Sequence, residues 1–330
     1  MDKPLRYVLK SSSHFHRCFM AFPLVDAHCH LHDERLWSSG SPPSRRTLED
    51  VLRRARNANL THVVSCATHE RDWRVLEQLI AQQEDNSMPS VVPCFGVHPW
   101  WAQELSPMTS DSLKPLRAIL TLHPAANVGE IGLCKSARGR QVPLEMQVKA
   151  FRAQLEIAAE LERTCILHCV GYYGKLLEIL QEFDKRGRLP PILVLHSYSG
   201  PPDMMRSFLR LRDTRVFFSL NAKQLTDPRM KKTVACCKES PLEALLFETD
   251  APDQAPSAEY AEKVFDCGVL DAVDTPLLLQ EDSTGVNEPA MVKLALLSAT
   301  EIRGVGMNEL AAAVYQNCKV AFRIDDAKLS

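Results

Sequence analysis

The stretch LVDAHCHLH, residues 24–32, is a short apolar run that ends in two histidines one residue apart. In an extended strand, residues i and i+2 point to the same face, so His28 and His30 aim their imidazoles at one point while Cys29 faces away. Two converging imidazoles suit a metal ion, although such pairs also occur by chance and exposed histidines are common. The ends of the other strands decide between a metal site and a coincidence.

Eight apolar runs of about 4–8 residues recur along the chain, separated by longer stretches with helical periodicity. Strands that are nearly all apolar need cover on both faces, and eight strand-helix units close a (β/α)₈ barrel. We therefore predict a single-domain α/β TIM barrel over residues 24–330, with His62 as a surface group at the start of its second strand. An open doubly wound sheet is the alternative, although no G-x-G-x-x-G follows the first strand. The predicted strands span residues 24–28, 62–67, 91–97, 127–133, 165–169, 192–196, 216–220 and 245–249, and the predicted helices span 47–58, 70–84, 110–122, 143–162, 172–186, 202–211, 228–238, 289–301 and 307–320.

The composition excludes several classes of protein. Of the 330 residues, 45% are hydrophobic and 24% are charged, as in ordinary globular proteins. The net charge of −2 excludes a broad basic surface for duplex DNA, so a nucleic-acid substrate needs a local basic site. No run approaches the roughly 18 apolar residues of a membrane-spanning helix. The eleven cysteines form no C-x-x-C pair, which indicates a reducing compartment, so we expect the protein in the cytoplasm, the nucleus or both. We also expect a monomer.

Residues 1–23 precede the first predicted strand and carry four cations, three consecutive serines and a single acid. This composition is a weak approximation to a mitochondrial transit peptide, so a mitochondrial location stays open. The alternative is a disordered or wrongly assigned extension, since Met20 would be an equally sensible start.

Polar side chains occupy the carboxyl ends of the predicted strands, where a TIM barrel carries its chemistry. Such groups cost several kcal/mol at the ends of buried strands unless they are paired or bound to metal. Imidazoles with carboxylates suit Zn²⁺, Mn²⁺ or Mg²⁺, and one carboxylate can bridge two ions about 3.5–4 Å apart. We therefore predict a site for divalent metal ions. The residues are His28 and His30 on the first strand, His98 on the third, Glu130 on the fourth, His168 on the fifth, His196 on the sixth, and Glu248 and Asp250 on the eighth.

Successive motifs at these strand ends resemble the signatures of the TatD-type metal-dependent deoxyribonucleases of the amidohydrolase superfamily. The motifs are VDAHCHL, CFGVHPW, VGEIGL, ILHC, LVLHSYSG, LLFETDAP, and NEPA followed by NCKVAF. They occur in order between residues 24 and 322, so the resemblance covers nearly the whole chain. It implies a barrel hydrolase that cleaves DNA phosphodiester bonds with two metal ions, often by trimming single strands from the 3′ end.

The resemblance also implies roles for individual residues. Asp250 is placed to accept a proton from the attacking water, His98 contacts the phosphate, and Glu248 orients a ligand histidine. The implied ligands are His28, His30 and Asp250 for one ion, His168 and His196 for the second, and Glu130 as the bridge between them.

The chain departs from the family pattern at two positions. Where members commonly read G-E-x-G-L-D, it has Cys134 in place of the aspartate, and where they read His-x-Arg-Asp after the fifth strand, Val170 replaces the arginine. The missing arginine removes an expected phosphate contact. The segments HCV and LHSYSG instead resemble a eukaryotic branch named from a fission-yeast protein that is a partner of a cell-cycle regulator, so a protein partner is a further expectation beside DNA.

The loop CKSARGR, residues 134–140, directly follows the fourth predicted strand and therefore lies on the predicted catalytic face. Lys135, Arg138 and Arg140 place three cations within six residues there, and Gly139 allows the backbone to turn. We predict that this loop binds the nucleic-acid backbone. The alternative is a solvated surface loop.

Two other functions stay open on the same residues. A hydrolase of a small phosphoester, ester or amide metabolite could use the same metals, because function depends on the periphery of the site. An interaction protein with a remnant metal site is the other alternative, and the intact ligand set argues against it.

Overall fold

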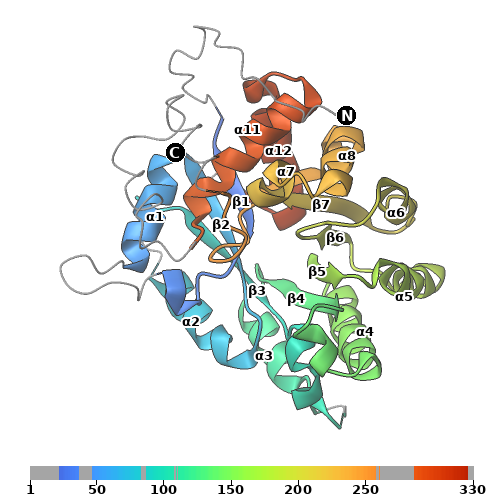
Figure 1. Ribbon diagram of the computed structural model, residues 1–330. Coiled ribbons are helices and arrows are strands. Elements are labelled where there is room, and N and C mark those ends of the chain that lie inside the picture. Colours follow the sequence, from blue (N-terminus) through green and yellow to red (C-terminus); the bar gives the residue numbers. More distant parts are fainter. Residues whose placement is uncertain are drawn as a thin grey trace, which may run out of the picture.

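The chain folds into a sheet of eight parallel strands in the order β1 to β8, rolled into a nearly closed barrel (Figure 1). The computed structural model describes residues 22–36, 47–82, 87–107, 109, 111–257, 260 and 286–325, so the predicted N-terminal segment lies outside it except for its last two residues. All eight predicted strands are present, and the TIM-barrel prediction is confirmed. The strands are β1 (Leu24–Cys29), β2 (Leu60–Cys66), β3 (Ser90–Phe95), β4 (Asn127–Cys134), β5 (Cys165–Val170), β6 (Ile192–Leu195), β7 (Arg215–Asn221) and β8 (Leu245–Glu248).

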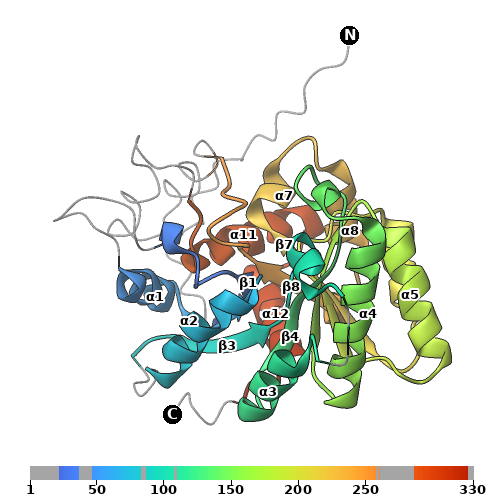
Figure 2. The same cartoon turned by 90° about the horizontal axis from the view of Figure 1, so that it is seen from below.

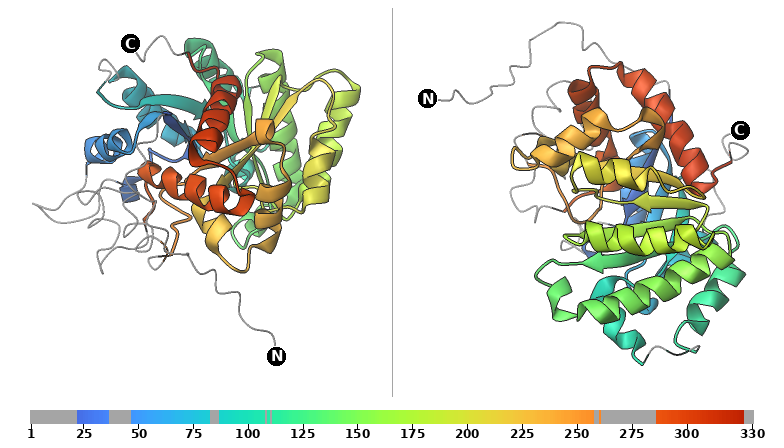
Figure 3. Two further views of the ribbon diagram at one scale, coloured as in Figure 1. Left: turned by 90° about the horizontal axis from the view of Figure 1, so that it is seen from above. Right: turned by 90° about the vertical axis from the view of Figure 1, so that its right-hand side faces the viewer.

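Helices surround the strands and cover the outside of the sheet (Figures 2 and 3). The α-helices are α1 (Leu48–Asn57), α2 (Glu70–Ala81), α3 (Lys114–Leu122), α4 (Leu144–Glu160), α5 (Tyr173–Lys185), α6 (Pro202–Phe208), α7 (Ala222–Thr226), α8 (Lys231–Glu239), α11 (Val292–Arg303) and α12 (Met307–Phe322). The short 3₁₀ helices are η1 (Glu34–Leu36), η2 (Pro99–Leu105), η3 (Gly139–Gln141), η4 (Leu242–Ala244) and η5 (Pro289–Met291). Helix α7 was not predicted, because its five residues are too few to show a helical period. Within the residues that the structure describes, every helix is too short or too polar to span a bilayer.

The strands read as continuous apolar runs because helices cover their outer faces while side chains fill the barrel. Every residue of β2 and of β4 is buried. The prediction for His62 is wrong: β2 begins two residues earlier, at Leu60, and His62 is only 6% exposed, with its Nδ1 3.0 Å from Thr61 Oγ1. A strand start in a barrel lies over the core rather than at the surface.

The first and last strands meet at a seam with few bonds. Among the described residues, no ladder joins β8 to β1, and the strand-type pairing between their ends is one isolated bridge of Cys29 with Ala251. Two further backbone bonds cross the seam: Asp250 N donates to His28 O at 2.9 Å, and His30 N donates to Ala251 O at 2.7 Å. The seam therefore coincides with the ends of the strands that carry the predicted ligands.

Hydrogen bonds between buried polar residues stabilise the seam. Asp26, which is fully buried, accepts hydrogen bonds from Thr249 N (2.9 Å) and Thr249 Oγ1 (2.5 Å). Asn287 Nδ2 donates to Thr249 O at 2.7 Å, and its neighbour Glu288 accepts two bonds from the buried Arg54, at 2.7 and 2.8 Å. The NEPA motif is thus a structural anchor that fixes the chain after β8 to the seam and to α1.

Candidate metal centre

The end of β1 presents two imidazoles to the mouth of the barrel, with Nε2 atoms of His28 and His30 3.4 Å apart. His30 Nδ1 lies 2.8 Å from Cys66 O, and because a carbonyl only accepts, the Nδ1 proton points to it and leaves the Nε2 lone pair for a metal. Asp250 leaves β8 with a left-handed φ of 58°, and its Oδ1 lies 3.3 Å from His30 Nε2 and 3.6 Å from His28 Nε2. These three side chains form one donor group.

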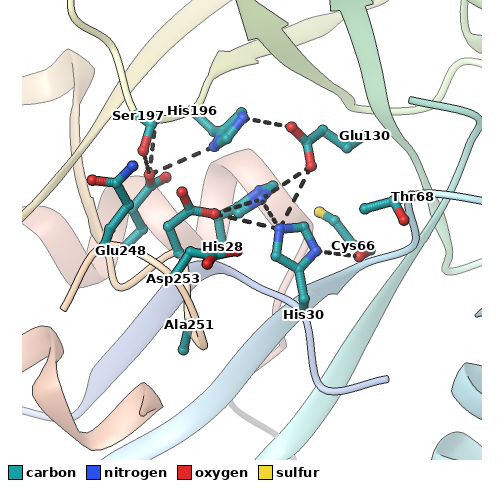
Figure 4. Close-up of polar contacts among 12 residues, drawn as sticks. His28, His30, Cys66, Thr68, Glu130, His196, Ser197, Glu248, Ala251 and Asp253 are labelled. Carbon is teal, nitrogen blue, oxygen red and sulfur yellow. Dashed lines mark hydrogen bonds and ion pairs between the residues drawn. The ribbon is translucent and has the colours of Figure 1, made fainter. Parts of the chain in front are cut away.

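Glu130 lies at the centre of the cluster, in the middle of β4, and is 2% exposed. Its Oε1 lies 2.6 Å from His168 Nδ1, 2.8 Å from His196 Nε2 and 3.4 Å from His98 Nε2. Its Oε2 faces the other group, 3.5 Å from His28 Nε2 and 3.7 Å from His30 Nε2 (Figure 4). One carboxylate therefore connects five histidines from four strands, with a separate oxygen for each side.

Glu248 supports His196 from beneath. Its Oε1 lies 3.6 Å from His196 Nδ1 and accepts hydrogen bonds from Ser197 N (2.8 Å) and Ser197 Oγ (2.7 Å) (Figure 4). The His196 ring stacks on that of His28 with centroids 3.9 Å apart. A carboxylate behind an imidazole fixes the ring and directs its other nitrogen forward, here toward Glu130.

Burial and neighbouring charges shift the pKa values of the cluster in different directions. Burial lowers the pKa of His28, and burial beside His168 lowers the pKa of His98 to about 3. Burial alone would lower the pKa of His30 too, but hydrogen bonding to Asp250 and the charge of Glu130 raise it to about 9. Burial would raise the pKa of Glu130, yet the surrounding histidines hold it well below its usual value. Glu130 is therefore ionised at neutral pH.

The donor set fits divalent metal ions. Several buried atoms of the cluster have no hydrogen-bond partner among the described residues, namely His28 Nδ1, His168 Nε2, His196 Nδ1 and Glu248 Oε2. Imidazole and carboxylate donors together suit ions such as Zn²⁺ and Mn²⁺. The geometrically compact groups, each with donors within 4.8 Å of one another, are His28, His30 and Asp250; His98, Glu130 and His168; and His28, His196 and Glu248.

The first of these groups is the set that the resemblance assigns to one ion. The second contains His98, which the resemblance assigns to the phosphate, beside His168 and the bridging Glu130. His196 lies 3.2 Å from His168 Nδ1, so it belongs to the same side of Glu130. All six predicted ligands are therefore brought together, with His98 as an additional donor in reach.

The predicted cationic loop is exposed beside the cluster. Arg138 and Lys135 lie over aromatic rings, with Arg138 Cζ 4.2 Å from the centroid of Trp100 and Lys135 Nζ 5.6 Å from that of Tyr172. Arg140 is exposed and is the middle residue of the short helix η3. In the described part of the chain, no carboxylate lies within ion-pair distance of these three cations.

Cys134 stands where the family pattern has an aspartate. Burial alone would raise the pKa of its thiol, but the nearby imidazole of His168 and the hydroxyl of Ser136 lower it to about 7, and Sγ lies 3.1 Å from Ser136 Oγ. A thiol with a lowered pKa ionises more readily than an ordinary cysteine.

Two residues near the cluster escaped the sequence analysis. Asp26 accepts hydrogen bonds from His28 N (3.3 Å) and from the backbone N of Thr249, the neighbour of Asp250. The sequence feature that could have indicated this role is an acid inside a buried apolar run. Trp100 packs on His98 with ring centroids 4.2 Å apart. Only its place two residues after a strand-end histidine could have indicated this contact.

A (β/α)₈ barrel with imidazoles and carboxylates gathered at the carboxyl ends of its strands defines a metal-dependent hydrolase. Sequence comparison agrees with this class: the TatD related DNase family matches residues 25–323. The chain belongs to the TatD related DNase family, and the resemblance seen in its motifs is confirmed.

Several relatives cover most of the chain. Human deoxyribonuclease TATDN3 is 25% identical over 306 residues, which cover 91% of this chain and 94% of the human protein. The uncharacterized metal-dependent hydrolase YjjV of Escherichia coli is 30% identical over 232 residues, covering 69% of this chain and 79% of YjjV. Cut9-interacting protein scn1 of Schizosaccharomyces pombe is 24% identical over 308 residues, covering 69% of this chain and 86% of scn1.

Solved structures show the same fold. A TatD family hydrolase from Entamoeba histolytica superposes with a TM-score of 0.73 at 20% identity, covering 92% of this chain and 98% of that one. The crystal structure of Escherichia coli YjjV gives a TM-score of 0.69 at 24% identity, with 92% and 98% coverage. At these identities the likeness concerns the barrel and its architecture.

Proposed function

We propose that this protein is a deoxyribonuclease that cleaves phosphodiester bonds at single-stranded DNA ends with two divalent metal ions. The observation that carries the proposal is Glu130, whose two oxygens face two separate donor groups. The names of relatives support it: TATDN3 is a deoxyribonuclease, and TatD of Citrobacter koseri, 26% identical over 280 residues, is a 3′-5′ ssDNA/RNA exonuclease.

The proposed ligands combine one observed donor group with the histidines around Glu130. His28, His30 and Asp250 would hold one ion, His168 and His196 would hold the other, and Glu130 would contribute to both. When bound, such ions lower the pKa of a water molecule and neutralise charge on the phosphate. Zn²⁺, Mn²⁺ and Mg²⁺ are the candidates.

Protein groups supply the remaining steps. Asp250 Oδ1 lies at the open side of the first donor group, 9% exposed, and accepts the proton that the attacking water loses. His98 lies beside Glu130 and His168, and with a pKa of about 3 it stays neutral, so it can donate one hydrogen bond to a phosphate oxygen or a lone pair to an ion. Lys135, Arg138 and Arg140 hold the phosphates beyond the scissile bond.

Turnover of end-labelled single-stranded DNA in Mg²⁺, Mn²⁺ and Zn²⁺ tests the proposal, beside the same sequence as a duplex and a panel of small phosphoesters. We expect stepwise shortening from the 3′ end of the single strand, abolished by a chelator and restored by metal. The position of the label identifies the polarity, and light scattering on the active fraction tests the expected monomer. Hydrolysis of a small phosphoester without DNA cleavage in any metal would contradict the proposal.

A second candidate function is hydrolysis of a small phosphoester or amide metabolite. The observation in its favour is Val170, which is 38% exposed at the mouth where the family pattern has a phosphate-binding arginine. The same ligands would serve this reaction, so substrate comparison alone distinguishes the two. A location in the cytoplasm or nucleus is part of the proposal, and the targeting hypothesis for residues 1–23 concerns residues that lie almost wholly outside the described ones.

A further inference from the structure

Trp100 lies at the mouth next to the metal centre, with Trp101 and Arg138 beside it. Trp100 is in η2, two residues after His98, and is partly exposed. Its ring centroid lies 4.2 Å from that of His98 and 6.3 Å from that of His168. Because both histidines contact Glu130, the indole borders the place where the scissile phosphate must lie.

Arg138 covers both indoles without being fixed by an acid. Its Cζ lies 4.2 Å from the centroid of Trp100 and 4.9 Å from that of Trp101. The side chain is exposed, and no carboxylate among the described residues is within ion-pair distance of it. Arg71, by contrast, lies over Trp101 at 4.7 Å and is also 3.9 Å from Asp72. Two arginines thus lie over Trp101, whereas Arg138 is the one cation over Trp100 among the described residues.

We infer that Trp100 is a nucleobase-stacking residue: the base next to the scissile phosphate takes the place of Arg138 on the indole, and Arg138 turns to the phosphate chain. The inference rests on the proposed nuclease function and adds a substrate-positioning residue to it. A cation on an exposed aromatic ring contributes about 2- to 5-fold to an equilibrium, whereas a base stacked on such a ring contributes about 5- to 150-fold. The exchange therefore favours the base, and it frees a guanidinium for phosphate.

This geometry has a consequence for the kind of substrate. A base can stack on a side chain only when it is out of the duplex, as in single strands and frayed ends. Stacking is tolerant of sequence because every base has a π face. Trp100 would thus select unpaired nucleotides of any sequence, and it would supply binding where the family arginine is replaced by Val170.

Variants at Trp100 test the stacking role against a purely structural one. The substrates are a 3′-labelled oligothymidylate and the same oligomer with abasic tetrahydrofuran units at its 3′ end. On oligothymidylate we expect Trp100→Leu to raise KM approximately 10-fold with little change in kcat, and Trp100→Phe to stay near the wild-type values. On the abasic oligomer we expect no difference between Trp100→Leu and wild type. Trp101→Leu is the matched control, with a KM within about 2-fold of wild type.

A second readout follows the indole itself. Stopped-flow mixing of wild-type protein with oligothymidylate should quench tryptophan fluorescence before product appears, and Trp100→Phe should lose that quench while it keeps cleaving. An equal loss on normal and abasic oligomers, or an unchanged KM in Trp100→Leu, would overturn the inference while leaving the nuclease proposal intact. If wild-type protein hydrolyses a small phosphodiester but neither binds nor cleaves the oligomer, the proposed function fails and the inference with it.

Discussion

The metal centre has a floor, which includes Glu130, Glu248 and the histidines that they contact, and a rim, which is the loop with Lys135 and Arg138. The two differ in how their side chains are held. On the floor, Glu130 is 2% exposed and contacts histidines from several strands, and Glu248 behind His196 is fully buried. On the rim, Lys135 and Arg138 are exposed and rest on aromatic rings, with no carboxylate partner among the described residues. The floor is fixed before substrate arrives, whereas the rim can rearrange around it.

The same division separates what the chain shares with its family from what it does not. The floor carries all the predicted metal ligands, while the two departures from the family pattern, Cys134 and Val170, lie at the ends of β4 and β5. Chemistry depends on the floor and substrate choice depends on the rim. Changes on the floor should therefore act on kcat and metal content, and changes on the rim on KM.

The largest effect is expected from Glu130→Ala. Removal of the carboxylate that faces both donor groups should lower turnover by at least about 1,000-fold and reduce metal content, because ion-based stabilisation of the transition state is lost. The barrel should stay folded, since the Glu130 carboxylate contacts the polar histidine cluster rather than the apolar core. Metal analysis, turnover and circular dichroism measure this, with the exposed Glu309→Ala as control. A folded variant that keeps two ions and full activity would contradict the assignment.

Glu248→Gln should have the next largest effect. The amide keeps the shape and the bonds from Ser197 but loses the charge behind His196, so metal affinity should fall about 10- to 100-fold. Isothermal titration with Mn²⁺ measures it, and Glu239→Gln, at an exposed carboxylate paired with Arg206, is the matched control. Unchanged affinity would show that the buried acid does not act through the histidine.

The pH dependence of metal binding should follow His30. Its pKa of about 9 in the metal-free protein means that metal must displace a proton, so apparent affinity should rise about tenfold per pH unit from pH 7 to 9 and then level. The stability of the metal-free protein should change in the opposite direction. Because folding raises the pKa of His30, its protonation adds to the free energy of unfolding, fully so below the pKa of about 6.5 that it has in the unfolded chain. This contribution is lost as the pH rises through 9. Titration calorimetry in buffers of different ionisation heat would show the released proton, and an affinity independent of pH would exclude it.

The smallest effect belongs to the rim. Arg138→Ala with Arg140→Ala should raise KM for DNA about 5-fold and make its dependence on salt shallower, because each phosphate contact releases counterions. Metal content and hydrolysis of a small phosphodiester should not change. Lys149→Ala with Lys319→Ala, at cations away from the mouth, is the control. A salt slope identical to wild type would place the loop outside the DNA site and favour a small substrate.

The fold, and the gathering of the proposed ligands at one end of it, could be predicted because both depend on short-range rules. Buried parallel strands read as apolar runs, and a histidine or acid within or just after such a run is conspicuous, as with Glu130 and His98. The position of His62 could not be predicted from its polarity, since strand β2 starts two residues earlier and covers it.

The roles of other residues depend on neighbours far along the chain. Asp26 acts through Thr249, 223 residues away in sequence, and Trp100 meets Arg138 from the loop after β4. The grouping of donors around Glu130, with His98 in reach of the second set, likewise depends on strand register and rotamers. Local patterns carry no information on such contacts.

The position of the seam gives the proposed metal site a structural role beside its catalytic one. His28 and His30 come from the first strand and Asp250 follows the last, and between these strands the described residues provide one isolated bridge and no ladder. An ion that binds all three side chains closes this join, and at 100 times its Kd it adds about 2.7 kcal/mol to the free energy of unfolding. Amide exchange at His30 and Asp250 should therefore be the first to quicken when the ions leave, and the supply of metal sets how much of the barrel is closed.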